Sequence, residues 1–126
     1  MSIPPAIVAV VDDDASALRG LGRVLSVFGY RANLFESAEQ YLAAADASTA
    51  SCVVLDIDLR GGMSGLDLAR TIRSSARATP IIFITGSADP AIRKQALDVG
   101  CVAFLEKPFP SELLITAIMK SRALGL

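Results

Sequence analysis

A short apolar run near the middle of the chain ends in a carboxylate. The residues from Cys52 to Leu55 are all apolar, and Asp56 follows them directly. An uninterrupted apolar run of this length is typical of a parallel strand that is covered on both faces. We therefore expect Asp56 to lie at the carboxyl edge of a buried sheet, which is where open α/β folds place their binding sites.

Apolar runs of this kind alternate with amphipathic segments along the whole chain, and this pattern predicts five strands and five helices. The strands are expected at Ala6–Val11, Arg31–Phe35, Cys52–Asp56, Ile81–Thr85 and Cys101–Glu106, and the helices at about 15–28, 38–45, 66–75, 90–99 and from 112 onward. Strictly alternating strands and helices are typical of a doubly wound parallel sheet. We predict one α/β domain over residues 1–126.

The expected helix ends carry recognisable capping residues. The predicted N-caps are Asp14, Ser37 in a Ser-x-x-Gln capping box with Gln40, Asp89 before Pro90, and Ser111, while Gly29 and Gly100 are the predicted stops. A polar loop is expected from Asp46 to Ser51. The spacing predicts inward-facing side chains at Leu18, Leu21, Leu25 and Phe28 of the first helix, and at Leu113, Leu114, Ala117 and Ile118 of the last.

Composition excludes several classes of function. With 12 basic and 13 acidic residues the net charge is -1, so the chain lacks the basic field that nucleic-acid binding requires. The longest apolar runs fall short of the roughly 20 residues that span a bilayer, so we expect a cytoplasmic protein with no membrane contact. The sequence contains no histidine, which excludes histidine-based catalysis, and we expect Cys52 and Cys101 to be reduced core thiols.

Polar side chains with complementary chemistry follow four of the expected strands. They are Asp12 and Asp13, Asp56, Thr85, and Lys107. Because the carboxyl ends of parallel strands share one edge, these groups are expected to converge. Carboxylates without other ligand types favour a hard divalent cation such as Mg²⁺. Taken singly, each has an ordinary explanation: the acidic pair as a solvated turn, Thr85 as a β-branched strand residue and Lys107 as a surface lysine. Together they predict a phosphoryl-binding pocket in which Asp56 is the nucleophile.

The motifs that contain these residues resemble the receiver domains of two-component response regulators. The resemblance rests on Val10-Val11-Asp12-Asp13, Val54-Leu55-Asp56, Ile84-Thr85-Gly86 and Phe104-Leu105-Glu106-Lys107-Pro108-Phe109, and it extends over residues 6 to 124. It implies a flavodoxin-like three-layer fold with strand order 2-1-3-4-5. It also implies that Asp56 accepts a phosphoryl group.

The resemblance assigns a role to each site residue. Asp13, Asp56 and the backbone carbonyl of Asp58 are expected to bind Mg²⁺ directly, and Asp12 through water. Lys107, joined to Pro108 by a cis peptide bond, is expected to contact a phosphoryl oxygen. Thr85 and Phe104 are the expected switch residues, whose movement remodels the face formed by the fourth helix, the fifth strand and the fifth helix.

The loop after Asp56 departs from the family pattern. Leu59-Arg60 replace the usual Met-Pro pair, and the run that ends at Gly65 is longer by one residue. Asp58 and Ser87 occupy positions that in the family tune the lifetime of the phosphoryl group. We hypothesise that the Asp58 carboxylate affects this lifetime.

The resemblance also implies the partners. With no histidine in the chain, the phosphodonor must be a sensor histidine kinase or a histidine phosphotransfer protein. The face formed by the fourth helix, the fifth strand and the fifth helix is the candidate surface for homodimerisation. The chain is either a stand-alone receiver or part of a larger regulator, and it is not expected to be a turnover enzyme. The alternatives are a haloacid-dehalogenase-like phosphatase, whose Asp-x-Asp motif fits Asp56 and Asp58 but whose acidic pair comes last in the chain, and a receiver-like scaffold that works without phosphorylation.

Overall fold

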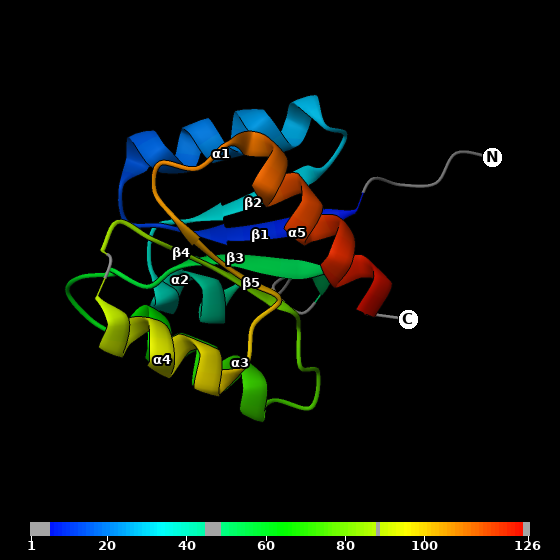
Figure 1. Ribbon diagram of the computed structural model, residues 1–126. Coiled ribbons are helices and arrows are strands. Elements are labelled where there is room, and N and C mark those ends of the chain that lie inside the picture. Colours follow the sequence, from blue (N-terminus) through cyan, green and yellow to red (C-terminus); the bar gives the residue numbers. More distant parts are fainter. Residues whose placement is uncertain (1–5, 45–48, 88, 125–126) are drawn as a thin grey trace.

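A computed structural model describes residues 6–44, 49–87 and 89–124. Five parallel strands form one sheet in the order β2-β1-β3-β4-β5, which confirms the expected fold (Figure 1). The strands are β1 Ile7–Val11, β2 Arg31–Phe35, β3 Cys52–Asp56, β4 Ile81–Thr85 and β5 Ala103–Glu106. The helices are α1 Ala15–Val27, α2 Ala38–Ala43, α3 Gly65–Ser74, α4 Pro90–Val99 and α5 Ser111–Leu124.

The sheet separates two hydrophobic cores. Helices α1 and α5 cover one face, and α2, α3 and α4 cover the other (Figure 1). Alternate strand residues face the two cores, so that Val54 packs on the α1 and α5 side while Val53 and Leu55 pack on the opposite side. Strands β3 and β4 are buried along their whole length, as their apolar sequences predict.

Most of the predicted helix caps are present. Asp14 accepts hydrogen bonds from the backbone N–H groups of Ser16 and Ala17, and Asp89 caps α4 ahead of Pro90. Gly29 and Gly100, just beyond the last residues of α1 and α4, have φ values of 87° and 100°, a region that glycine enters without strain. The caps therefore fix where the helices begin at the carboxyl edge of the sheet.

The capping box of α2 is only half as predicted. Ser37 Oγ accepts a hydrogen bond from Gln40 N at 3.0 Å, but Gln40 Oε1 accepts from Glu36 N at 2.8 Å rather than from Ser37 N. The return bond thus goes to the residue before the cap.

Some predicted boundaries are shifted. Helix α5 begins at Ser111 itself, so this residue lies within the helix instead of capping it. Strand β5 begins at Ala103, although Val102 N already donates a hydrogen bond to Ile81 O at 2.8 Å. Helix α2 ends at Ala43; Ala45, where it was predicted to end, and positions 46–48 of the expected loop lie outside the described residues.

Two residues predicted to face the core are exposed. Leu113 is 51% exposed and Phe28 is 48% exposed. The buried residues of α5 are Leu114, Ile115, Ala117, Ile118 and Ser121. Their spacing of three and four places the core-facing stripe of the helix one position later than Leu113, and this rotation turns Leu113 outward. Leu18 and Leu25 of α1 are buried as expected.

Both cysteines carry free thiols, as predicted. Cys52 is buried in β3 and Cys101 is only partly buried, and burial raises the pKa of both thiols. Across the described ranges, no helix combines the length and apolar character that crossing a bilayer requires.

The register of α5 predicts different costs for two adjacent leucines. Leu114 is fully buried, so Leu114→Ala should lower the free energy of unfolding by about 2–5 kcal/mol, measured by urea denaturation. Leu113→Ala removes a side chain that is already half exposed and should cost less than about 1 kcal/mol. Equal costs for the two variants would contradict this register.

Candidate functional site

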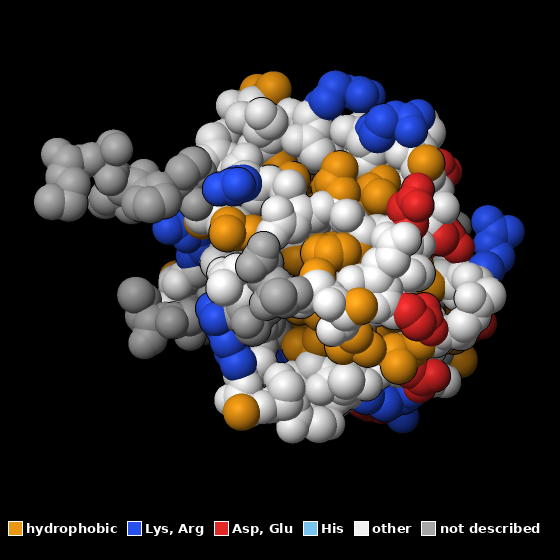
Figure 2. Space-filling view, turned by 180° about the vertical axis from the view of Figure 1, so that it is seen from behind, with side chains coloured by type: hydrophobic (Ala, Val, Ile, Leu, Met, Phe, Trp, Pro, Cys, Tyr) orange, Lys and Arg blue, Asp and Glu red, His pale blue; other side chains and the backbone are white. Residues whose placement is uncertain are grey.

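The carboxyl ends of four strands bring the predicted site residues together. Asp56 and Thr85 are the last residues of β3 and β4, while Asp12 and Lys107 directly follow β1 and β5. The strands are in matching register, with Asp56 beside Ile84 and Thr85 beside Glu106. The predicted convergence is therefore confirmed, and the rear view shows acidic side chains gathered toward the edge at which the strands end (Figure 2).

Lys107 joins two buried carboxylates. Its Nζ donates hydrogen bonds to Asp12 Oδ2 at 2.9 Å and to Asp56 Oδ2 at 3.0 Å. Asp12 is fully buried and Asp56 is 3% exposed, so bulk water does not stabilise the negative charge of either carboxylate. The ammonium group is thus the cation that allows two carboxylates to lie at the same sheet edge.

The second oxygen of each carboxylate accepts a backbone hydrogen bond. Asp56 Oδ1 accepts from Asp58 N at 2.8 Å, and Asp12 Oδ1 accepts from Asp14 N at 2.9 Å. In each case the donor lies two residues further along the chain, in the turn that leaves the strand. These turns hold the two carboxylates in fixed orientations, each with one oxygen directed at Lys107.

Burial and crowding set the protonation of this pair. Burial raises the pKa of Asp56 to about 6, repulsion by Asp12 adds to the rise, and the hydrogen bonds from Asp58 N and Lys107 oppose it. For Lys107, burial lowers the pKa, but the hydrogen bonds and charges of Asp12 and Asp56 outweigh burial and raise it overall. Lys107 therefore stays charged while Asp56 is held less firmly in its ionised form.

Asp13 completes an acidic group with Asp12 and Asp56. Each of the three can offer a carboxylate oxygen, and these oxygens lie within 4.8 Å of one another. Asp13 is partly exposed, and its Oδ2 accepts a hydrogen bond from Arg60 N at 3.0 Å. Three oxygen donors with one solvent-facing member suit a hard divalent cation that retains water ligands, so the residues present fit Mg²⁺.

Asp58 was grouped with the metal-binding residues, but its side chain turns to β4. Asp58 Oδ2 accepts a hydrogen bond from Thr85 Oγ1 at 2.8 Å and another from Gly86 N at 2.9 Å. The Asp58 carboxylate is therefore outside the acidic group of Asp12, Asp13 and Asp56. The predicted role of Asp58, through its backbone carbonyl, stays a prediction.

Phe104 lies in β5, two strand positions before Glu106. Its ring packs against the core on the α3 and α4 side of the sheet. The guanidinium carbon of Arg93 lies 5.3 Å from the ring centroid, and Arg93 Nη1 is 3.8 Å from Glu106 Oε1. Arg93 of α4 thus contacts the Phe104 ring through a cation–π interaction and also forms an ion pair with Glu106 of the same strand.

Sequence reasoning missed the part that Gly65 plays at the start of α3. A Cβ atom at this position would overlap the carbonyl oxygen of Asp56 and approach Ile57 Cα to 2.7 Å. Only glycine lets α3 begin this close to the strand that carries Asp56. The glycine-rich composition of the loop was visible in the sequence, but a close backbone approach leaves no periodic signal.

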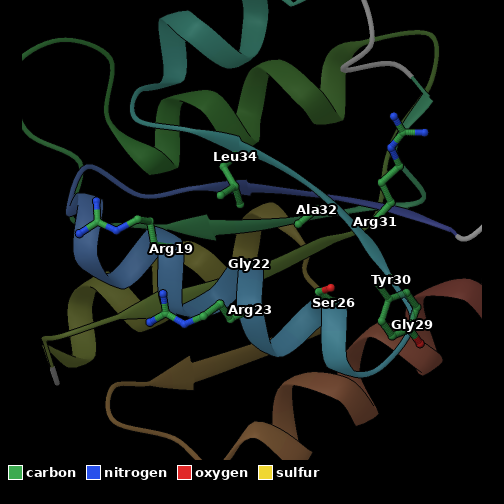
Figure 3. A pocket seen from close by; sticks show the side chains of 9 residues that line it. All are labelled: Arg19, Gly22, Arg23, Ser26, Gly29, Tyr30, Arg31, Ala32 and Leu34. Atoms are coloured by element: carbon green, nitrogen blue, oxygen red, sulfur yellow. The ribbon is translucent and has the colours of Figure 1, made fainter.

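A groove on another side of the molecule was not predicted either. It has a volume of about 740 Å³ and lies between α1 and β2, with Arg19, Arg23 and Ser26 on the helix and Leu34 on the strand (Figure 3). The acidic pocket itself measures about 520 Å³. Because the groove presents arginines and no carboxylate, it is chemically unlike the acidic pocket.

The fold and this edge define the class of the protein: a flavodoxin-like α/β domain with an acidic pocket, a lysine and a hydroxyl at the carboxyl ends of its strands. Residues 8–119 match the sequence model of the response regulator receiver domain. The chain therefore belongs to the receiver domains of two-component response regulators, as the sequence motifs indicated.

Curated relatives support the assignment. The chain is 34% identical over 118 residues to the response regulator protein TodT of Pseudomonas putida, covering 94% of the chain and 52% of the relative. It is 34% identical over 112 residues to the transcriptional regulatory protein FixJ of Bradyrhizobium diazoefficiens, covering 89% and 54% respectively. The chain thus spans about half the length of the curated relatives it matches.

Solved structures agree in fold. A crystal structure of FixJ-N superimposes with a TM-score of 0.85 at 31% identity, covering 96% of each chain. A CheY-like receiver domain protein from Methanospirillum hungatei superimposes with a TM-score of 0.87 over 96% of each chain at 23% identity, which shows a shared fold. A BeF3-activated receiver domain of DrrB superimposes with a TM-score of 0.81 at 28% identity, covering 93% of the chain and 97% of that structure.

The raised pKa of Asp56 predicts a pH-dependent stability difference in the metal-free protein. The folded state binds the Asp56 proton more tightly than the unfolded state, so this stabilisation is present below about pH 4 and is lost as the pH rises through about 6. Asp56→Asn should therefore gain stability relative to the unsubstituted chain between about pH 4.5 and about pH 7.5, by about 2 kcal/mol. Urea denaturation in a chelating buffer measures the difference, and a pH-independent value would contradict the raised pKa.

Proposed function

We propose that Asp56 accepts a phosphoryl group from a phosphohistidine of a partner protein. The observation that carries this proposal is the pair of hydrogen bonds from Lys107 Nζ to Asp12 and Asp56. A nucleophilic carboxylate must approach a phosphoryl group that is itself negatively charged, and a fixed cation beside it offsets that repulsion. Family membership supports the same reaction.

The transfer balances without a further reactant. An oxygen of the Asp56 carboxylate attacks phosphorus, a new O–P bond forms, and the N–P bond to the donor imidazole breaks. The imidazole leaves with the bonding electron pair and takes a proton from solvent. Lys107 stays protonated throughout, because its raised pKa keeps the ammonium form, and it can shift from Asp56 to a phosphoryl oxygen.

Mg²⁺ is the cofactor that suits the acidic group. Asp13 and Asp56 would hold the ion directly, Asp12 through water, and the backbone carbonyl of Asp58 would supply a further oxygen. When bound, the ion neutralises negative charge on the carboxylates and on the incoming phosphoryl oxygens. Burial, with added repulsion by Asp12, raises the pKa of Asp56 to about 6, which supports a bound cation as a favourable addition to this pocket.

Phosphorylation is proposed to act through Thr85 and Phe104. Thr85 would donate its hydroxyl proton to the new phosphoryl group, and Phe104 would rotate inward, away from Arg93. These movements would shift the equilibrium between the inactive and active conformations of the face formed by α4, β5 and α5. That face is the proposed output surface, and homodimerisation would use it.

A histidine kinase or a histidine phosphotransfer protein is the proposed donor. The chain has no histidine, so it cannot form its own phosphohistidine. We assign to the chain only its own phosphorylation and the slow loss of the phosphoryl group, with no turnover of an outside substrate. The proposed location is the cytoplasm, where these donors have their catalytic domains.

Phosphoryl uptake tests the proposal. With Mg²⁺ and radiolabelled acetyl phosphate, the unsubstituted chain should take up close to one equivalent of label, and Asp56→Asn should take up essentially none. Lys107→Ala should slow uptake by roughly 100-fold or more, because it removes the cation that meets the developing charge. Label that persists in Asp56→Asn would place the acceptor elsewhere.

The phosphatase alternative gives a different result in a turnover assay. Incubation with p-nitrophenyl phosphate should release no more than about one equivalent of product per chain within the lifetime of the phosphoryl group, since the proposed site passes that group to water only slowly. Sustained multiple turnovers would support the phosphatase.

Stabilisation by Mg²⁺ tests the ion site. An ion that binds only the folded state at about 100 times its Kd should raise the free energy of unfolding by about 2.7 kcal/mol. Asp13→Asn should lose most of this gain, measured as a Tm shift on adding MgCl2. Asp98→Asn is the matched control, because Asp98 is an exposed carboxylate paired with Lys94 and should leave the gain unchanged. Equal Mg²⁺ gains in both variants would rule out the site.

A further inference from the structure

Thr85 has its hydroxyl proton already committed to another acceptor. Thr85 Oγ1 donates to Asp58 Oδ2 at 2.8 Å, with Ser87 O at 3.3 Å as a longer second acceptor, and the same oxygen accepts from Ser87 N at 3.0 Å. Thr85 is fully buried, so water cannot replace a lost partner without a rearrangement. The side chain is thus held on both its donor and its acceptor sides.

Asp58 is well placed to hold this proton. Its Oδ2 also accepts from Gly86 N at 2.9 Å, so one carboxylate oxygen binds two donors at the end of β4. A hydrogen bond to an ionised acceptor is about twice as strong as one between neutral groups. Asp56, by contrast, directs one oxygen to Lys107 and the other to Asp58 N, and receives nothing from Thr85.

From this geometry we propose that Asp58 is a latch on Thr85, a positioning residue that restrains the switch in the unphosphorylated chain. The latch rests on the proposed function of Asp56 for its consequence, although the Thr85–Asp58 bond is a property of the unmodified chain. A hydroxyl has one proton, so a phosphoryl group on Asp56 gains it only when Asp58 gives it up. The hydrogen bond of Thr85 therefore drives the switch only by the difference between its free energy with the phosphoryl group and its free energy with Asp58.

The latch makes activation harder than in a chain that lacks it. Losing the Asp58 bond subtracts from what Thr85 gains at the phosphoryl group, so the active population is smaller for the same phosphorylation. Asp58→Asn keeps the size of the side chain but replaces the ionised acceptor with a neutral amide. The variant should therefore release Thr85 more easily and favour the active state.

Binding of beryllofluoride with Mg²⁺ tests the latch, because this probe stands in for a phosphoryl group on Asp56. Titration followed by NMR at the Gly86 amide should show Asp58→Asn binding the probe about tenfold more tightly than the unsubstituted chain. Asp98→Asn is the control for the loss of one negative charge: Asp98 is an exposed carboxylate paired with Lys94, and it lies outside the acidic pocket. This control should bind with nearly unchanged affinity.

A double-substitution cycle separates the latch from simple repulsion by the Asp58 charge. In a Thr85→Ala background there is no hydroxyl to restrain, so Asp58→Asn should no longer tighten binding. Thr85→Ser, which keeps the hydroxyl, should restore the gain. A tenfold gain that survives in Thr85→Ala overturns the latch and assigns the effect to charge alone.

A measurement without any probe keeps the test independent of the phosphorylation proposal. Three-bond couplings to the Thr85 methyl group should report a single χ1 rotamer in the unsubstituted chain and rotamer averaging in Asp58→Ala. An unchanged single rotamer in Asp58→Ala overturns the latch even if beryllofluoride binds. Absence of probe binding and of phosphoryl uptake, with averaging present, overturns the proposed function and leaves the restraint itself standing.

Discussion

The site depends on one ammonium group held between two buried carboxylates. Without Lys107, Asp12 and Asp56 would face each other at the sheet edge with only a backbone hydrogen bond apiece to offset their burial. Removing one partner of such a buried set is costly, because the remaining charges lose their compensation. The ammonium group of Lys107 that stabilises these two carboxylates without a metal ion is also the cation that would meet an incoming phosphoryl group at Asp56.

Much of this arrangement was predictable because parallel strands impose it. Once the apolar runs are read as strands of a doubly wound sheet, Asp12, Asp56 and Lys107 must follow strand ends on the same edge, whatever the helices do. The strands at Arg31–Phe35, Cys52–Asp56 and Ile81–Thr85 match the structure to the residue. Apolar runs and their positions along the chain are properties of the local sequence, and tertiary packing does not change the strands that they predict.

The features that sequence reasoning predicted wrongly or did not predict at all depend on side-chain direction or on close contacts. Leu113 faces solvent because the rotation of α5 is set by its packing on the sheet, which the apolar spacing of one helix does not fix. The Asp58 side chain accepts a hydrogen bond from Thr85 Oγ1 and lies outside the acidic group, and the sequence does not determine which partner this carboxylate takes. The close approach at Gly65 likewise arises only when α3 is placed against β3.

The two hydrophobic cores on opposite faces of the sheet contact different residues of β5. Phe104 packs into the core shared with α3 and α4, while its neighbour Leu105 packs into the core shared with α1 and α5. The proposed rotation of the Phe104 ring would therefore act first on the packing beneath α4. Its neighbour in the strand, Leu105, would carry the change to the core beneath α5, so one strand links the two helices of the proposed output face.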